Sequence, residues 1–336
     1  MIVVGIESSC DECAVAFVRD GRELLGQVVH SQIRAHERYQ GVVPEIASRR
    51  HTELILPVYR QALKEAAISP SEIDAIAVTT HPGLSGSLLV GTTFAKGLCI
   101  GLNRPLVSVN HILAHLYAPH LVATVEYPCL GLLVSGGHTM IARLDAWDEL
   151  TVLGATIDDA CGEAFDKVAK FHNFGYPGGK AVDELAARGD DTAYDFPGSA
   201  LKGHGHSLDV SYSGIKTAVT AQAARFLRPG KTASPENLAA SFQRVAIGMI
   251  MKRLDRAVEQ TGLVRLVVGG GVAANSRLRR ELEKRRHLEV AIPPMSLCTD
   301  NAAMVAAIGY EYAEHKRFAG LDVPVGARVA GYKAAY

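Results

Sequence analysis

The chain has 336 residues, of which 48% are hydrophobic, enough for a sizeable core and more than one small domain. Lys and Arg number 35 and Asp and Glu number 35, so the formal net charge is zero. This balance excludes a nucleic-acid binder that relies on overall charge, so any RNA contact needs a local patch or a partner's charge. The six cysteines are scattered beside apolar residues, which is typical of a reduced protein without a disulfide framework.

The N-terminal segment carries acidic residues and no basic leader, which argues against a signal peptide. No apolar run approaches the roughly 20 residues that a membrane span needs. We therefore expect a cytoplasmic protein that does not associate with membranes.

A hairpin pattern occurs twice along the chain. Apolar residues 2–6 precede a polar turn at 7–12 and a second apolar run at 14–18. The same plan returns as an apolar run at 130–134, a turn at 135–139 and a run at 140–144. Each copy predicts two strands joined by a tight turn.

A strand, a glycine-rich turn and a helix also follow one another twice. Residues 73–80 lead into a turn at 82–86 and a helix to about 102, and residues 265–268 lead into Gly269–Gly271 and a helix over about 275–286. Such turns direct backbone N–H groups and a helix N-terminus at a bound anion.

Because the four features recur in matching order, the sequence predicts an internal duplication. The expected fold is α/β, with the two lobes of the actin, sugar-kinase and Hsp70 superfold (ASKHA) and a central nucleotide cleft. We expect a first lobe at 1–127 with 315–336, including a helical insert at 31–67, and a second lobe at 128–314. Two unrelated Rossmann-like halves remain the alternative. The charged insert is consistent equally with a solvated face and with a macromolecular contact surface.

A histidine pair predicts a metal site. His111 and His115 lie four residues apart among apolar residues at helical spacing, so both imidazoles share one helix face. A pair of core histidines is an equally good interpretation of that spacing. Ile112 occupies the place where a zincin protease needs its glutamate, which makes a protease unlikely. Asp300, just before an apolar helix at 302–313, is by itself consistent with a helix cap.

Ten collinear motifs carry a resemblance to a known family: GIESSCDE (5–12), GVVPEIASR (41–49), PGLSGSLLVG (82–91), NHILAH (110–115), LLVSGGHT (132–139), IDDACGEAFDKVAK (157–170), YPGG (176–179), SYSGIKT (211–217), GGGVAANSRLR (269–279) and CTDNAAM (298–304). Over nearly its whole length the sequence resembles the tRNA N6-adenosine threonylcarbamoyltransferases. It departs from the family pattern at Gln40 and Lys180, where the family usually has glycine and proline.

The resemblance implies which residues bind what. It implies that His111, His115 and Asp300 hold one divalent metal ion per subunit, with iron(II) favoured and zinc as the alternative. Two imidazoles and one carboxylate leave coordination positions open, which suits a catalytic ion. It implies that an adenylate, or ATP, ADP or AMP, binds in the cleft to Leu133, Val134, Ser135, Gly136, Gly137, Asp166, Gly179, Asp183 and Asn275.

The implied reaction is acyl transfer. The family passes the threonylcarbamoyl group of L-threonylcarbamoyl-adenylate to N6 of the adenosine next to the anticodon of tRNA, and AMP leaves. The exocyclic amine needs a base, for which Asp11 and Glu12 are the candidates and His138 is less favoured. Capping of the turn is an equally good role for each acid singly. The implied partners are tRNA, a paralogous subunit of the same fold in a heterodimer, and a small P-loop ATPase subunit.

Two other functions stay open. The fold permits an actin-like small-molecule kinase, although such kinases hold magnesium through carboxylates and water rather than a histidine pair. A nucleotide-dependent scaffold without chemistry is the second alternative. The basic stretch at 277–286 offers a local patch for tRNA, but its interspersed glutamates favour a solvated helix.

Overall fold

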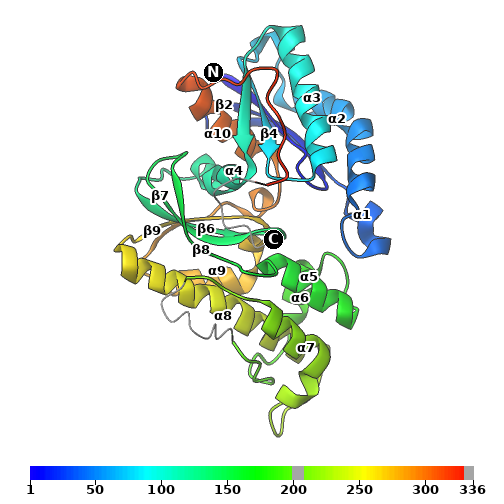
Figure 1. The fold of residues 1–336 in the computed structure, drawn as a ribbon, viewed down its shortest axis with the longest axis vertical. Helices are drawn as coiled ribbons and strands as arrows, with labels where there is room; N and C mark the ends of the chain where they lie inside the picture. The colour runs from blue at the N-terminus through cyan, green and yellow to red at the C-terminus, as the bar shows by residue number, and fades with distance from the viewer. Residues whose placement is uncertain (199–207, 329–336) are drawn as a thin grey trace. The chain divides into compact units, whose positions relative to one another are not determined.

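The computed structural model describes residues 1–198 and 208–328 (Figure 1). These residues form two compact units, one made of Met1–Val125 with the segment that begins at Ile292, and one made of Glu126–Ala291. The sequence placed residues up to 314 in the second lobe. The structure instead assigns 292–314 to the first unit, because the helix in this segment packs on the first sheet.

The first unit is a five-stranded sheet with helices on both faces. Its strands run in the order β3-β2-β1-β4-β5, with β1, β2 and β3 antiparallel and β1, β4 and β5 parallel. The strands are β1 (Ile2–Glu7), β2 (Glu12–Arg19), β3 (Glu23–Ser31), β4 (Ala75–His81) and β5 (Leu106–Asn110). The α-helices are α1 (Ile33–His36), α2 (Pro44–Ala66), α3 (Ser85–Leu102), α4 (His111–Tyr117) and α10 (Ala302–Glu314).

The second unit repeats this topology. Its sheet has the order β8-β7-β6-β9-β10, again with an antiparallel meander followed by two parallel strands. The strands are β6 (Cys129–Val134), β7 (Thr139–Leu144), β8 (Leu150–Ala155), β9 (Arg265–Gly269) and β10 (Glu289–Ala291). The α-helices are α5 (Cys161–His172), α6 (Gly178–Ala186), α7 (Ser213–Phe226), α8 (Pro235–Thr261) and α9 (Ser276–Glu283). The shared strand order confirms the predicted duplication.

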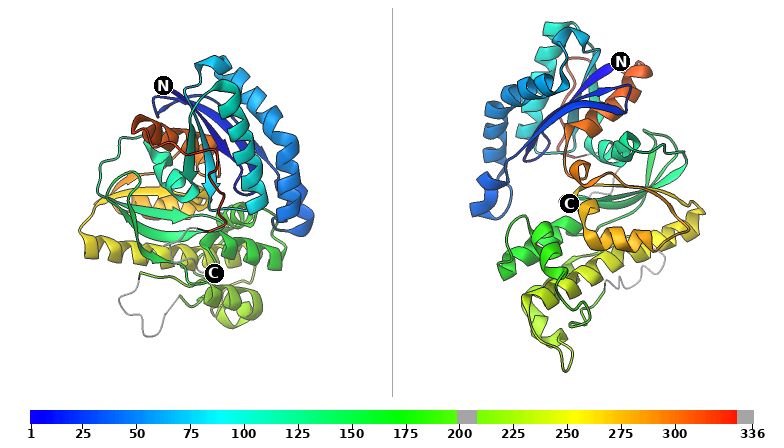
Figure 2. Two further views of the ribbon diagram at one scale, coloured as in Figure 1. Left: turned by 45° about the horizontal axis from the view of Figure 1, so that its top comes forward. Right: turned by 180° about the vertical axis from the view of Figure 1, so that it is seen from behind.

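Alternate residues of β1 face opposite sides of the first sheet, and each side is covered by different helices. Val4 and Ile6 belong to the apolar core that α2 and α3 cover. Val3 and Gly5 face α10 instead, and α10 packs on β1, β2 and β4 (Figure 2). At Gly309 in α10 an added Cβ would lie 2.5 Å from the Cβ of Ala77 in β4, so only glycine permits this approach. The close packing explains why the last part of the chain returns to the first sheet.

Helix α3 is unusually apolar for the amount of it that is buried. Its 18 residues have a mean hydropathy of 1.2, and 33% of them are buried inside the structure. By length and composition alone this helix is apolar enough to span a membrane, and the sequence did not lead us to expect this. Core helices of soluble proteins reach the same length and hydropathy. Leu89 and Ile100 remain 53% and 70% exposed.

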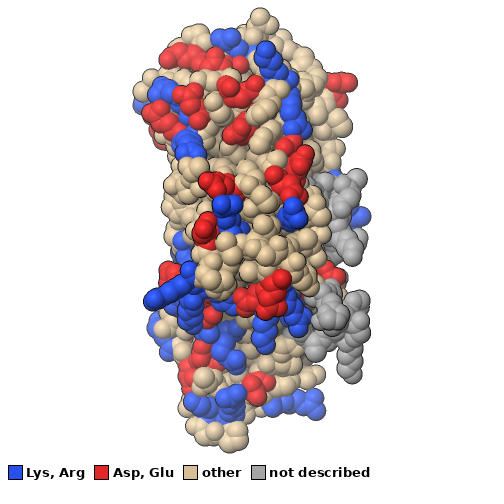
Figure 3. Space-filling model, turned by 90° about the vertical axis from the view of Figure 1, so that its left-hand side faces the viewer, with Lys and Arg blue, Asp and Glu red and all other residues tan. Residues whose placement is uncertain are grey.

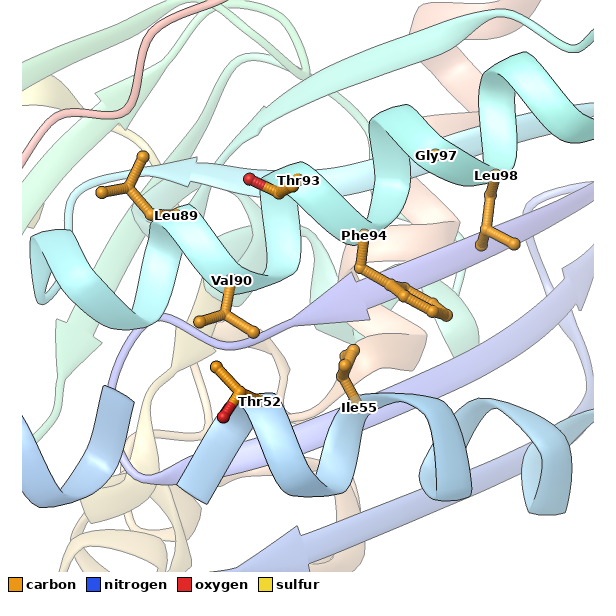
Figure 4. A pocket seen from close by; sticks show the side chains of 8 residues that line it. All are labelled: Thr52, Ile55, Leu89, Val90, Thr93, Phe94, Gly97 and Leu98. Carbon is orange, nitrogen blue, oxygen red and sulfur yellow. The ribbon is translucent and has the colours of Figure 1, made fainter. Parts of the chain in front are cut away.

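A groove of about 620 Å³ lies between α2 and α3 (Figure 4). Phe94 and Val90 of α3 face Ile55 of α2 across it, as the close-up shows. The complete lining is Thr52, Ile55, Leu89, Val90, Thr93, Phe94, Gly97 and Leu98. The groove and the exposed side chains of α3 together form an apolar face of the first unit.

Candidate metal centre and nucleotide-binding residues

Helix α4 begins directly after β5 and places the histidine pair. The Asn110 side chain caps it by accepting hydrogen bonds from the amides of Ile112 and Leu113. His111 and His115 are both buried, and their ring centroids lie 4.6 Å apart with the planes at 77°. The predicted helical spacing is therefore confirmed, and both imidazoles lie on one face of α4.

Asp300 joins the two imidazoles from the other end of the chain. Its Oδ1 lies 3.0 Å from His115 Nε2 and 3.7 Å from His111 Nε2. Asp300 is not the cap of α10, because Asn301 takes that position and accepts from the Met304 amide. The interpretation of Asp300 as a simple helix cap is therefore wrong.

The three ligand atoms fit a divalent ion. They all lie within 4.8 Å of one another. Ligands about 2.1 Å from a tetrahedral ion are roughly 3.4 Å apart, and both distances from Asp300 are close to this value. The donor set of two imidazoles and a carboxylate suits iron(II) or zinc and leaves coordination positions open.

Glu7 supports the metal centre from the end of β1. Its side chain is completely buried, and Oε2 lies 3.1 Å from His111 Nδ1. Burial opposes a charge on His111, but Glu7 and Asp300 outweigh burial and raise the pKa of His111 to about 9. This contact was not predicted from the sequence, although a glutamate at the end of an apolar strand was a signal for it.

The two candidate bases lie in the turn between β1 and β2. Asp11 is 8% exposed, and its carbonyl accepts from the Gln32 amide. Glu12 begins β2 and accepts a hydrogen bond from the Ser31 hydroxyl. Burial, followed by the charges of Asp11 and Asp300, raises the pKa of Glu12 well above its usual value. Both acids thus belong to the same unit as the metal ligands.

In the second unit, Leu133 and Val134 end β6 and residues 135–137 form the turn. The Ser135 amide donates to the carbonyl of His138 at 2.8 Å, which closes the turn. In this structure the Ser135 amide is therefore used within the turn, and the predicted role of Ser135 in nucleotide binding stays a prediction. An added Cβ at Gly136 or Gly137 would meet nothing within 4 Å, so space lies above both glycines. The turn is wide enough for a ligand to reach the main chain.

Asp166 and Gly179, two of the residues predicted to bind the nucleotide, are in contact with each other. Its Oδ1 accepts from the amides of Gly178 at 2.8 Å and Gly179 at 3.3 Å, so the carboxylate caps the N-terminus of α6. An added Cβ at Gly179 would meet nothing within 4 Å. Asp166 and Gly179 therefore lie together beside open space.

Asp183 and Asn275 also lie together. Asp183 Oδ1 accepts from Asn275 Nδ2 at 3.4 Å and from Ser276 Oγ at 2.7 Å, and Oδ2 accepts from the Ser276 amide at 3.1 Å. Gln243 Nε2 donates to the same Oδ1 at 2.5 Å. The contacts of Ser276 and Gln243 with Asp183 were not predicted from the sequence. Gln243 lies within the long helix α8, where no motif marks it as a site residue.

Three of the six cations in the basic stretch at 277–286 form ion pairs within their own unit. Arg277 pairs with Asp191 at 2.6 Å and Arg285 pairs with Asp255 at 2.6 Å, while Glu281 contacts three of the cations. Figure 3 shows one face of the molecule, on which acidic and basic side chains are interspersed. These ion pairs support the interpretation of a solvated helix over that of a tRNA site.

Sequence comparisons identify the family to which the chain belongs. A family model for tRNA N6-adenosine threonylcarbamoyltransferase matches residues 23–307. A protein of that name from Treponema denticola is 53% identical over 332 residues, which cover 99% of this chain and 98% of the relative. One from Borrelia hermsii is 47% identical over 333 residues, covering 99% of this chain and 98% of the relative.

Solved structures of low identity share the fold. Component A of the (R)-2-hydroxyglutaryl-CoA dehydratase of Acidaminococcus fermentans has a TM-score of 0.56 at 14% identity, covering 94% of this chain and 99% of that chain. Full-length HypF has a TM-score of 0.62 at 13% identity, covering 95% of this chain and 56% of that chain. The fold is the duplicated α/β fold of actin, sugar kinases and Hsp70. The match over 23–307 and the near full-length relatives show that this chain belongs to the tRNA N6-adenosine threonylcarbamoyltransferase family.

Proposed function

We propose that this chain transfers the threonylcarbamoyl group from L-threonylcarbamoyl-adenylate to N6 of the adenosine next to the anticodon of tRNA. A bond forms between N6 and the carbamoyl carbon, and the bond from that carbon to the phosphate oxygen breaks. The amine loses one proton and AMP leaves. The proposal rests on family membership, and one structural observation carries it: His111, His115 and Asp300 converge on one point.

The metal ligands have a defined chemical use in this reaction. An iron(II) or zinc ion held by the three side chains would supply a Lewis acid for the carbamoyl carbonyl. His111 and His115 project from a capped helix and Asp300 precedes another, so the ligands stand on rigid elements.

The second unit offers groups that suit the adenylate. The turn at Gly136 and Gly137 is exposed and has room for a phosphate beside both Cα atoms, and main-chain amides at such a turn stabilise the charge that AMP carries as it departs. Asp166 and Asp183 are carboxylates, which are acceptors suited to ribose hydroxyls, and both lie at helix N-termini of the second unit. Leu133, Val134, Ser135, Gly179 and Asn275 complete the proposed site.

We assign the base to one of two acids in the turn between β1 and β2, the buried Asp11 or the partly buried Glu12. Glu12 suits the role of base, because burial and neighbouring acids disfavour its charged form and raise its pKa. Replacing each acid singly by alanine should separate the two: the base is the residue whose loss abolishes transfer while adenylate binding is retained. Full transfer activity in both variants would exclude both residues as the base.

The small-molecule kinase and the scaffold are less well supported. Magnesium in a kinase prefers carboxylate and water ligands, whereas two of the three side chains here are imidazoles. A scaffold has no use for converging metal ligands.

Purified chain, its partners, unmodified tRNA and threonylcarbamoyl-adenylate together test the proposal. Mass spectrometry of the digested tRNA should reveal the threonylcarbamoylated adenosine, with one AMP released per modified nucleoside. The matched control is His115→Ala, which removes one metal ligand and should lose the product. Formation of ADP and a phosphorylated small molecule from ATP, without modified tRNA, would favour the kinase.

We further propose that the apolar face of α2 and α3 binds a paralogous subunit of the same fold. Helix α3 is too apolar to face water with only a third of it buried, and Leu89 and Ile100 are more than half exposed. Ile100→Glu should abolish heterodimer formation in size-exclusion chromatography and leave the isolated chain folded. A homodimer in place of the heterodimer would contradict the proposal. The small P-loop ATPase and tRNA are the other proposed partners. We also propose a cytoplasmic location, which suits six cysteines that form no disulfide within the described residues.

A further inference from the structure

Glu7 is buried without an arginine or lysine partner among the described residues, and three groups of this unit hold it. Its Oε1 accepts from the Ser9 amide at 2.6 Å, and its Oε2 accepts from the Thr79 hydroxyl at 2.6 Å. The same Oε2 lies 3.1 Å from His111 Nδ1. These bonds join the ends of β1 and β4 to the first residue of α4. A carboxylate held so firmly imposes an orientation on the imidazole that it contacts.

The two imidazoles of the metal centre differ in this support. His111 Nδ1 faces Glu7, with the Ser9 hydroxyl at 3.3 Å as a second neighbour, so this nitrogen carries a proton and Nε2 faces Asp300. His115 Nδ1 is buried and has no hydrogen-bond partner in the structure. Only His111 therefore has a partner on the side away from the metal ligands.

We propose that Glu7 is a positioning residue that keeps the proton of His111 on Nδ1 and so presents Nε2 to the metal. A carboxylate behind a histidine ligand fixes the tautomer and the ring orientation and makes the imidazole a stronger donor. Glu7 also adds a negative charge close to the cation without occupying a coordination position. His111 becomes the anchoring ligand and His115 the weaker one. This inference rests on the proposed metal centre.

The first experiment measures zinc affinity by competition with a chelating dye, without turnover. Glu7→Gln keeps the size of the side chain but removes its charge. It also replaces one carboxylate oxygen by an NH₂ group, so one of the three hydrogen bonds that Glu7 accepts is lost. The affinity should fall about 10- to 100-fold, the usual loss when an outer partner of a metal ligand is removed. Ile76→Val is the control for lost packing in the same sheet and should leave the affinity unchanged. An unchanged affinity in Glu7→Gln would overturn the proposal.

The second experiment uses the unaltered protein and so does not depend on the folding of a variant. In zinc-loaded protein, nitrogen-15 NMR should show a proton on His111 Nδ1 at a hydrogen-bonded shift, with Nε2 bound to the ion. Coordination through Nδ1 would overturn the proposal. His115→Ala tests the metal centre separately from the role of Glu7. If it lowers zinc affinity and Glu7→Gln does not, only the role of Glu7 fails. If neither lowers it, the metal centre itself fails.

Discussion

Gly5 of β1 lies directly against the backbone of Ala302 in α10: a Cβ at Gly5 would come within 2.2 Å of the Ala302 carbonyl oxygen. Ala302 follows Asp300 by two residues, so this contact holds the carboxylate beside the histidines of α4. The metal centre thus depends on a strand position without a side chain.

Gly5→Ala should therefore destabilise the first unit and weaken metal binding together. The added methyl group has no room against backbone, which costs about 1–3 kcal/mol or more. Urea unfolding and zinc titration would measure the two effects. Gly101→Ala in α3 is the control, because nothing lies within 4 Å of its Cβ. It should raise stability by about 0.5–1 kcal/mol. Normal zinc affinity in Gly5→Ala would show that α10 can shift without moving Asp300.

Zinc should stabilise the folded chain through its three ligands. A ligand that binds only the folded state adds about 4 kcal/mol to the free energy of unfolding at a thousand times its dissociation constant. The melting temperature should rise with added zinc in the unaltered chain and stay nearly constant in His115→Ala. An equal rise in both proteins would mean that the ion binds elsewhere.

Asp183→Ala should lower both the stability of the second unit and its affinity for a nucleotide. The change leaves the Ser276 amide and hydroxyl and the Gln243 amide without their acceptor, which costs about 2–4 kcal/mol of stability. It should also abolish AMP binding in calorimetry. Asp145→Asn is the control, because it removes only the exposed ion pair with Arg143, which is worth under about 1 kcal/mol. Intact AMP binding in Asp183→Ala would limit Asp183 to capping α9.

His120 makes the first unit sensitive to acid. Burial lowers its pKa to about 4 from 6.5, while the Tyr117 carbonyl opposes this only in part. The unfolded chain takes up the proton at about pH 6.5 and the folded chain only near pH 4. The free energy of unfolding therefore falls by roughly 3 kcal/mol as the pH decreases through this window.

His120→Phe should flatten that pH dependence. Phenylalanine can keep the stack on the Tyr117 ring, which is 4.0 Å from the His120 ring, but loses the hydrogen bond to the Tyr117 carbonyl. The variant should be about 1 kcal/mol less stable at pH 7 and lose less stability on acidification. Urea unfolding at half-unit steps from pH 7 to 4 would measure both slopes. Parallel slopes would show that other groups control the acid response.

Local patterns in the sequence predicted what depends on local geometry. The spacing of His111 and His115 placed both rings on one face of α4, because four residues make about one helical turn. The two hairpins and the two glycine turns predicted the duplication for a similar reason. The edge strands β3 and β8 were not predicted, since β3 is exposed at both ends and most of β8 is only partly buried, which weakens the period-two pattern.

Contacts between distant residues were beyond sequence spacing. Asp300 joined the metal site only through the family resemblance, because its place depends on how α10 packs on β1. Glu7 lies 104 residues from His111, and nothing in the spacing relates them. The end of the second lobe was expected at residue 314, but the second unit ends at Ala291. No local pattern in the sequence shows that α10 packs on the first sheet through the contacts of Gly5 and Gly309.

The first unit draws its parts from both ends of the chain, and this has a consequence for biosynthesis. Residues 126–291 are continuous, so the second unit can fold on the ribosome as soon as they emerge. The face of the first sheet that includes Val3 and Ala77 stays exposed until α10 has been translated. The three candidate metal ligands therefore come together only after the whole second unit has been translated, because Asp300 follows it along the chain.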